Sequence, residues 1–276
     1  MLPFRVYIVH LFRASHRRVH MDEQLRLAGI TNYSYVEGVD GRKLGKADLS
    51  LHATSDAKLS FSELGCYLSH VRAWEQMDRD GVEVALILED DVIISADLVS
   101  VLSRINKFPP NWELIHVADI PADPNAPHQL NHWGIVDLDS SYVIGTSMSY
   151  RITGLGYLVH LRGVKNILPF LRKPIFKPVD HMLFEYSSNY HFFHSIKPSL
   201  VFLRRDIKSE LRNKDSFNNL GEHLNWQTRI AGILSKWTWN ILSFFPVPAK
   251  RYTTRREQNM LMYFLHLLRD YFFRRR

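Results

Sequence analysis

Three consecutive acids, Glu89, Asp90 and Asp91, are the residues of this sequence best placed to do chemistry. They directly follow the apolar run Val84–Leu88 and precede the apolar residues Val92–Ile94. Adjacent carboxylates repel one another, and a charge at a buried strand end is costly unless something pairs with it. A divalent cation resolves both problems, and oxygen ligands suit Mg²⁺ or Mn²⁺. The alternative is a solvated turn, but the apolar residues on both sides favour a crevice inside the molecule.

The run Val84–Leu88 is apolar at every position and has the length of one strand. Such a run is typical of a strand that is buried on both faces, as in the middle of a parallel sheet. Ligands of open α/β sheets bind at the carboxyl ends of the strands. The acids are therefore expected at the edge of the sheet where a ligand would bind.

The chain opens with a strand, a helix and a second strand, expected over Arg5–Leu11, Ser15–Ala28 and Tyr33–Val36. This β-α-β opening has neither the G-x-G-x-x-G fingerprint nor a Walker A sequence, so the usual dinucleotide and P-loop functions have no support. Arg13 and Arg17 lie near the start of the helix, where they could contact a diphosphate. An exposed helix face is the alternative for each arginine taken singly.

Leu59–Met77 has the periodicity of a helix, and Ser60 with Glu63 forms the S-x-x-E capping box at its start. Ser69 and His70 lie in the middle of this helix. A lone histidine at such a position is more often a hydrogen-bonded core or surface residue than a ligand.

Several blocks in this order and spacing resemble glycosyltransferase family 25, the lipopolysaccharide β-galactosyltransferases and procollagen galactosyltransferases. They are V-D-G at 39–41, L-S-F-S-E-L-G-C-Y-L-S-H at 59–70 and A-L-I-L-E-D-D-V at 85–92, and the likeness runs to about Ser199. The resemblance implies an α/β fold of the GT-A (Rossmann-like) class and a UDP-sugar donor. It also implies Mn²⁺ (or Mg²⁺) held at the Glu-Asp-Asp triplet, and inversion at the anomeric carbon.

By the same resemblance, the nucleotide lies over the first strand and the exit of the second. The residues expected to contact it are Val9, His10, Arg13, Arg17, Asp40, Gly41, Ser69, His70, Glu89 and Asp90. The expected metal ligands are Glu89 and Asp91, of which Asp91 is the stronger candidate, with His194 as a third.

Lys177–His181 resembles the P-V-D block of the family and supplies the candidate general base, Asp180. An inverting transferase needs a carboxylate that takes the proton of the acceptor hydroxyl as the new bond forms. The alternative is that Asp180 caps a helix over Met182–Ser187, and both roles can hold together. His181, His191 and His194 follow, and the sequence does not decide which of them completes the metal shell.

The composition of the 276 residues, 46% hydrophobic and 23% charged, is that of a globular protein. Cys66 is the only cysteine, which excludes an intramolecular disulfide framework and a cysteine-based zinc site and fits a reducing compartment. The apolar stretch near the start is short and is followed by basic residues, unlike a signal peptide. We expect a catalytic domain over 1–203, a linker over 204–223 and a helical extension over 224–276.

The net charge of +7 is concentrated at the end of the chain. Residues 249–276 hold eight basic and two acidic side chains, a net +6, so the remainder is nearly neutral and nucleic-acid binding is not expected. Aromatic and basic residues alternate in the extension, as in helices that lie on anionic membranes, and no apolar run is long enough to span a bilayer. The alternative is a helix pair packed on the catalytic domain or on a second subunit of a homodimer.

Together these features predict a cytoplasmic enzyme, peripheral on the inner membrane. It would transfer a hexose from a UDP-sugar to a lipid-linked oligosaccharide of lipopolysaccharide or lipooligosaccharide. Galactose is the first expectation and glucose the alternative. A non-catalytic protein that binds UDP-sugars or saccharides on the same scaffold is the rival interpretation.

Overall fold

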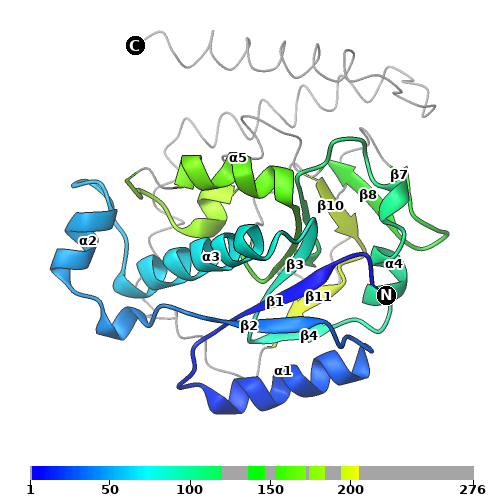
Figure 1. Ribbon diagram of the computed structural model, residues 1–276, viewed down its shortest axis with the longest axis horizontal. Helices are drawn as coiled ribbons and strands as arrows, with labels where there is room; N and C mark the ends of the chain where they lie inside the picture. Colours follow the sequence, from blue (N-terminus) through cyan, green and yellow to red (C-terminus); the bar gives the residue numbers. More distant parts are fainter. Residues whose placement is uncertain (1, 120–135, 147–152, 172–173, 184–193, 205–276) are drawn as a thin grey trace, which may run out of the picture. The chain divides into compact units, whose positions relative to one another are not determined.

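A computed structural model describes residues 2–119, 136–146, 153–171, 174–183 and 194–204 of the chain (Figure 1). The expected linker and helical extension lie outside the described residues, apart from Arg204, and so does His191. Among the residues that the structure describes, no helix combines the length and the apolar character needed to cross a membrane.

The main sheet has eight strands in the order β2-β1-β3-β9-β5-β10-β8-β7. β2, β1, β3, β5, β10 and β7 run in one direction, and β9 and β8 run in the other. Their bounds are Tyr33–Glu37 (β2), Arg5–His10 (β1), Val84–Glu89 (β3), Gly156–His160 (β9), Leu114–His116 (β5), His194–Lys197 (β10), Val143–Thr146 (β8) and Val136–Asp137 (β7). The predicted α/β fold is confirmed. β3 lies inside the sheet as expected, but only β1 is parallel to it, since β9 is antiparallel.

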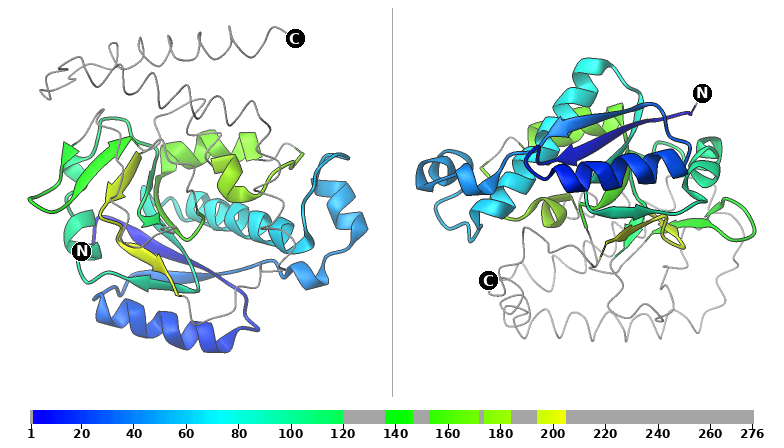
Figure 2. Two further views of the ribbon diagram at one scale, coloured as in Figure 1. Left: turned by 180° about the vertical axis from the view of Figure 1, so that it is seen from behind. Right: turned by 90° about the horizontal axis from the view of Figure 1, so that it is seen from below.

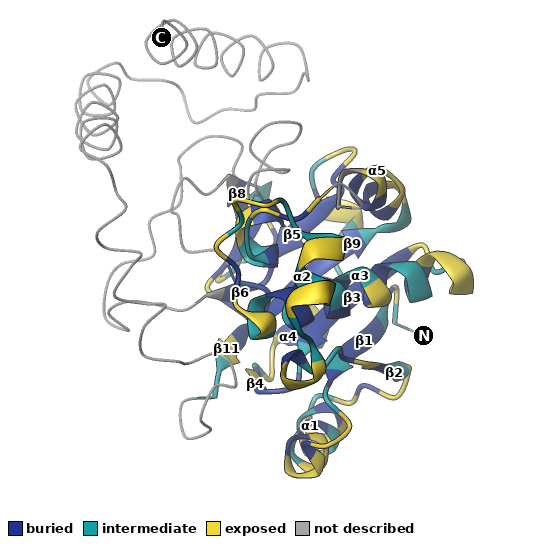
Figure 3. Cartoon of the chain, turned by 90° about the vertical axis from the view of Figure 1, so that its left-hand side faces the viewer, coloured by how far each residue is buried: buried dark blue, intermediate teal, exposed yellow. Residues whose placement is uncertain are grey.

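Helices cover both faces of this sheet. α1 (Ser15–Leu27) lies below the strands in Figure 1, and α3 (Phe61–Asp80) and α5 (Leu161–Leu171) lie above them, as the reverse view in Figure 2 also shows. Figure 3 shows buried strands between helices whose outer sides are exposed. Three shorter helical segments are α2 (Lys46–His52), η1 (Gly41–Lys43) and η2 (Ile105–Lys107).

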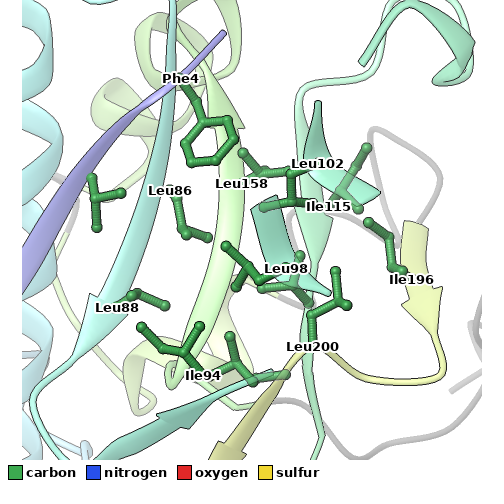
Figure 4. Packing of buried hydrophobic residues seen from close by; sticks show 14 of the residues in the cluster. Phe4, Leu86, Leu88, Ile94, Leu98, Leu102, Ile115, Leu158, Ile196 and Leu200 are labelled. Carbon is green, nitrogen blue, oxygen red and sulfur yellow. The ribbon is translucent and has the colours of Figure 1, made fainter. Parts of the chain in front are cut away.

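β3 contributes side chains to two separate apolar cores, because successive side chains of a strand point to opposite faces. Leu86 and Leu88 pack into the core under α1, together with α4 (Leu98–Leu102), as Figure 4 shows for part of this cluster. Ala85 and Ile87 pack into the other core with side chains of α3 and α5. The whole run is buried, which confirms the interpretation of Val84–Leu88 as a strand covered on both sides.

A second, three-stranded sheet has the order β4-β11-β6, formed by Val92–Ile94, Val201–Leu203 and Ala118–Asp119. β4 begins directly after the acid triplet, so the acids occupy the turn where the chain passes from one sheet to the other. The backbone N–H of Arg204, after β11, donates to the carbonyl oxygen of Asp91 at 2.9 Å. The turn is therefore held from both sheets.

α3 begins and ends as its sequence predicts. The Ser60 side chain accepts a hydrogen bond from the backbone of Glu63, whose carboxylate returns to the backbone of Ser60, so the capping box is confirmed. Gly81 ends the helix with a φ of 62°, a left-handed conformation that glycine adopts readily. This helix presents His70, Ser69 and Cys66 toward the carboxyl-terminal end of the sheet.

Candidate functional site

The acid triplet lies inside the molecule, as its apolar neighbours predicted. Asp90 and Asp91 are only 5% and 6% exposed, whereas Glu89 at the end of β3 is partly exposed. Val9, an expected nucleotide contact, lies opposite Glu89 in the β1–β3 pairing and is also partly exposed. The three carboxylates therefore have different surroundings, and each must be considered separately.

Asp90 is fully engaged by two basic side chains. Its Oδ2 lies 2.7 Å from Nδ1 of His10, at the end of β1, and its Oδ1 accepts from Nη1 of Arg17, on α1, at 2.7 Å. Hydrogen bonds between charged groups are stronger than neutral ones, and here they are buried. Asp90 therefore ties β1 and α1 to the acid turn, and Arg17 is directed inward rather than toward a diphosphate.

Asp91 is the carboxylate whose hydrogen bonding is incomplete among the described residues. Its Oδ2 accepts from Arg17 Nη1 at 3.2 Å, while its buried Oδ1 has no hydrogen-bond partner among the described residues. Burial, and next the negative charge of Glu89, raise the pKa of Asp91 to about 7. A buried acceptor without a partner among the described residues is a place where a water molecule or an ion can bind. Asp91 and Glu89 together offer the oxygen donors that suit Mn²⁺ or Mg²⁺, so these residues fit the implied cation.

Glu89 faces His70 across the junction of β3 and α3. Nε2 of His70 lies 3.4 Å from Oε1 of Glu89, and Nδ1 of His70 lies 2.8 Å from the hydroxyl of Tyr157 on β9. A Cβ atom at Gly154 would come within 2.7 Å of Oε1 of Glu89. The backbone of Gly154 therefore approaches the Glu89 carboxylate closely.

The blocks around Gly41 and Ser69 meet through close backbone contacts. Ser69 Oγ accepts from the backbone N–H of Val39 at 2.7 Å and donates to the carbonyl oxygen of Gly65 at 2.6 Å. A Cβ atom at Gly41 would lie 2.5 Å from the carbonyl oxygen of Phe61, so only glycine fits there. Ser69 therefore positions the loop that carries Asp40 and Gly41.

Asp40, another expected nucleotide contact, is paired with two arginines. Arg42, next to it in η1, and then Arg13 hold the pKa of the Asp40 carboxyl well below its usual range. Arg13 donates from Nε to Oδ2 of Asp40 at 2.8 Å, near the surface. The loop and the start of α1 are thus linked beside the carboxyl ends of β1 and β2.

Asp180 lies near the acids although 89 residues separate it from Asp91 in the sequence. Burial raises the pKa of Asp180, and the charge of Glu89 adds to this effect, so the two carboxylates are within electrostatic range. The backbone N–H of His181 donates to its Oδ1 at 2.8 Å. The expected cap of a helix starting at Met182 is corrected, because the helix already begins at Val179 and Asp180 lies in its first turn.

The structure does not bring His194 to the acids. His194 begins β10, three strands from β3, and the strand registers align it with Leu86 rather than with Glu89. Strand spacing puts the two backbones roughly 14 Å apart across the sheet and roughly 10 Å apart along it. The predicted third metal ligand is therefore corrected, because His194 is at the amino end of its strand and the acids are at the carboxyl end of theirs. Burial lowers the pKa of His194 to about 4.

Cys66 and Tyr157 lie beside His70 but were not among the site residues expected from the sequence. Cys66 lies one helical turn before His70, and this i, i+4 spacing was the signal in the sequence. Tyr157 follows from no local pattern, since it reaches His70 from β9 across 87 residues.

Comparison with known proteins gives consistent matches. The family model described as "Glycosyltransferase family 25 (LPS biosynthesis protein)" matches residues 4–183. Procollagen galactosyltransferase 1-A of Xenopus laevis is 26% identical over 261 residues, covering 80% of this chain and 40% of that protein. A glycosyltransferase 25 family member of Anopheles gambiae is 28% identical over 194 residues, covering 64% and 31%. The chain thus spans well under half the length of these relatives.

One similar solved structure is a glycosyltransferase involved in the glycosylation of the major capsid of PBCV-1. Its sequence identity is 14% and its TM-score 0.42, with coverage of 74% of this chain and 94% of that one.

Proposed function

Because this chain belongs to glycosyltransferase family 25, we propose that it transfers galactose from a UDP-sugar to a saccharide acceptor with inversion at the anomeric carbon. The observation that carries this proposal is the buried Asp91, whose Oδ1 has no partner among the described residues, at the carboxyl end of the central strand. Galactosyltransferase relatives support the choice of sugar. Glucose is the alternative that the assay below includes.

Asp91 and Glu89 would hold a divalent cation, Mn²⁺ or Mg²⁺. Bound there, the cation would stabilise the negative charge that develops on the departing UDP. Asp90 does not join this pair, because His10 and Arg17 already occupy its two oxygens. In the proposal, Asp90, His10 and Arg17 orient the acid turn.

The nucleotide would lie over the carboxyl ends of β1 and β2, against Val9 and the loop of Asp40 and Gly41. This loop is fixed by Ser69 and by the close packing of Gly41 on α3. Arg13 is the arginine placed to turn toward a diphosphate, because its ion pair with Asp40 is near the surface, where such pairs contribute little.

Asp180 would act as the general base. It would accept the proton of the acceptor hydroxyl while that oxygen bonds to the anomeric carbon and the bond to UDP breaks. A carboxylate whose pKa is raised by burial is a better proton acceptor near neutral pH than an exposed one. The position of Asp180 near Glu89 supports this role.

We propose a lipid-linked oligosaccharide as the acceptor, because the matching family is described by lipopolysaccharide biosynthesis. The +6 charge of residues 249–276 supports attachment of a cytoplasmic enzyme to the anionic inner membrane. Sedimentation with vesicles of anionic lipid, lost in high salt and absent with neutral lipid, is the expected result. Equal binding to both lipids would reject this attachment.

The transfer is tested by UDP release from UDP-galactose and UDP-glucose, with and without Mn²⁺, in the presence of oligosaccharide acceptors. We expect release with UDP-galactose that depends on Mn²⁺ and is lost in Asp91→Ala. Asp78→Asn is the matched control, because Asp78 is exposed on α3. Full metal-dependent activity in Asp91→Ala would reject the site, and UDP-sugar binding without turnover would reject catalysis.

A further inference from the structure

Three potential metal ligands of different chemistry gather beside the acid turn. They are the thiol of Cys66, Nε2 of His70 and the carboxylate of Glu89, and their ligand atoms all lie within 4.8 Å of one another. We propose that Cys66, His70 and Glu89 bind a thiophilic divalent cation such as Zn²⁺. This site differs from the oxygen-only pair of Asp91 and Glu89 in its ligands and therefore in the metal it prefers.

The distance between the His70 and Glu89 ligand atoms matches tetrahedral coordination, and Cys66 lies within reach of both. Bond lengths of roughly 2.0–2.3 Å from Zn²⁺ to nitrogen, oxygen and sulfur place neighbouring ligand atoms roughly 3.3–3.8 Å apart. Nε2 of His70 and Oε1 of Glu89 are already 3.4 Å apart. Cys66 and His70 are one turn apart on the same face of α3, so only small side-chain adjustments are needed to close the site.

His70 is the second, independent observation that points to a ligand. It is 0% exposed, and its Nε2 has no hydrogen-bond partner among the described residues. The other ring nitrogen contacts the Tyr157 hydroxyl at 2.8 Å. A neutral ring that donates its Nδ1–H to this hydroxyl presents the lone pair of Nε2 to Glu89 and Cys66. Such a second hydrogen bond is the usual support of a metal-binding histidine.

The surroundings of these three side chains carry a negative potential that favours a cation. Cys66 and Glu89 are partly exposed. Gly154 has no side chain, whereas a Cβ atom at this position would lie 2.7 Å from Glu89 Oε1 and 3.1 Å from His70 Nε2. Burial, then the charges of Glu89 and Asp180, raise the pKa of the Cys66 thiol. The same negative charges attract a cation, which on binding displaces the thiol proton to solvent.

The ligand set decides which cations fit. A thiolate and an imidazole favour Zn²⁺ over the hard ion Mg²⁺. The single cysteine excludes a zinc site built from several cysteines, but three mixed ligands with one open position need no second cysteine. Because Glu89 belongs to both sites, we expect Zn²⁺ to compete with Mn²⁺. This competition rests on the proposed function, whereas Zn²⁺ binding itself does not.

Titration of the purified full chain with Co²⁺ tests the site, because a thiolate bound to Co²⁺ gives a charge-transfer absorption band. The chain has one cysteine, so any such band comes from Cys66. We expect the band to appear with one equivalent of Co²⁺ and to disappear when Zn²⁺ is added. Absence of the band in the wild-type protein would overturn the proposal without reference to any variant.

Variants then identify the other ligands. Cys66→Ser should lose the band, and His70→Gln should weaken Zn²⁺ binding by more than about 100-fold, since supporting residues alone change metal affinity by about 10–100-fold. Tyr157→Phe should fall in that supporting range. His52→Gln, on α2, is the matched control and should bind Zn²⁺ as the wild type does. Wild-type affinity in a His70→Gln protein with native circular dichroism would overturn the assignment.

The proposed function and the proposed metal site of Cys66, His70 and Glu89 can be rejected independently of each other. Calorimetry of UDP binding with Mn²⁺ tests the donor site and does not depend on a thiolate. A Co²⁺ band without Mn²⁺-dependent UDP binding would support the Cys66 site and reject the proposed function. Mn²⁺-dependent UDP binding without the Co²⁺ band would support the proposed function and reject the Cys66 site.

Discussion

Replacing Asp91 with asparagine should stabilise the metal-free protein while removing its proposed activity. Asp91 is 6% exposed, and burial with the charge of Glu89 raises its pKa from an ordinary 3.8 to about 7. Each pKa unit corresponds to about 1.4 kcal/mol, so the charged form of Asp91 lowers the free energy of unfolding by about 4 kcal/mol. Asparagine can keep an oxygen toward Arg17 without the charge.

The pH dependence follows from the direction of the shift. Below the unfolded-state pKa of 3.8, Asp91 is protonated in both states and contributes no penalty. As the pH rises, the unfolded state loses its proton first, so the free energy of unfolding falls until the folded carboxyl also ionises near pH 7. The difference between Asp91→Asn and the wild type should therefore be about 2 kcal/mol near about pH 5 and about 4 kcal/mol near about pH 8.

Urea unfolding in the presence of a chelator measures this difference. Asp78→Asn, which removes an exposed carboxylate of α3, should show no comparable change with pH. In separate samples without chelator, Mn²⁺ at about a hundred times its Kd should stabilise the wild type by about 2.7 kcal/mol and leave Asp91→Asn unchanged. Parallel pH profiles for Asp91→Asn and wild type, or a less stable variant at high pH, would refute the reasoning.

Three further predictions use other residues of the site. Asp180→Asn should lower kcat by about 10²–10⁴-fold. The Kd for UDP, measured by calorimetry, should change only by a small factor. A loss of UDP affinity with unchanged kcat would contradict the role of Asp180 as the base. Arg17→Met should lower the free energy of unfolding by about 3–5 kcal/mol in urea, because it leaves Asp90 and Asp91 buried without their shared cation; a change under about 1 kcal/mol would show that these ion pairs do not matter. Gly154→Ala should destabilise the protein by about 1–3 kcal/mol, since its Cβ would lie 2.7 Å from Glu89 Oε1; unfolding at the wild-type urea concentration would show that the space is larger than the structure indicates.

Local sequence patterns predicted the central parts of this fold. The uninterrupted apolar run identified β3, and the Ser60–Glu63 capping box placed the start of α3 within two residues. Both signals lie within a single element, so they do not depend on how distant segments pair. The burial of Asp90 and Asp91 followed from the apolar residues on either side of them.

The other features could not be predicted, because they depend on pairing between segments that are distant in the sequence. His194 follows the Asp180 block in sequence, but β10 joins the sheet beside β5 and carries His194 away from the acids. Arg17 was expected to meet a diphosphate, yet it points to Asp90, a contact across 73 residues that no local spacing reveals. The antiparallel insertion of β9 next to β3 was also not readable from either strand alone.

The acid turn depends on a segment that is made much later in synthesis. β4, directly after the acids, pairs with β11, and Ser95 donates its backbone N–H to Leu200. A nascent chain that ends at Ile94 lacks β11, so the acid turn is held from the second sheet only after Leu203 has been synthesised.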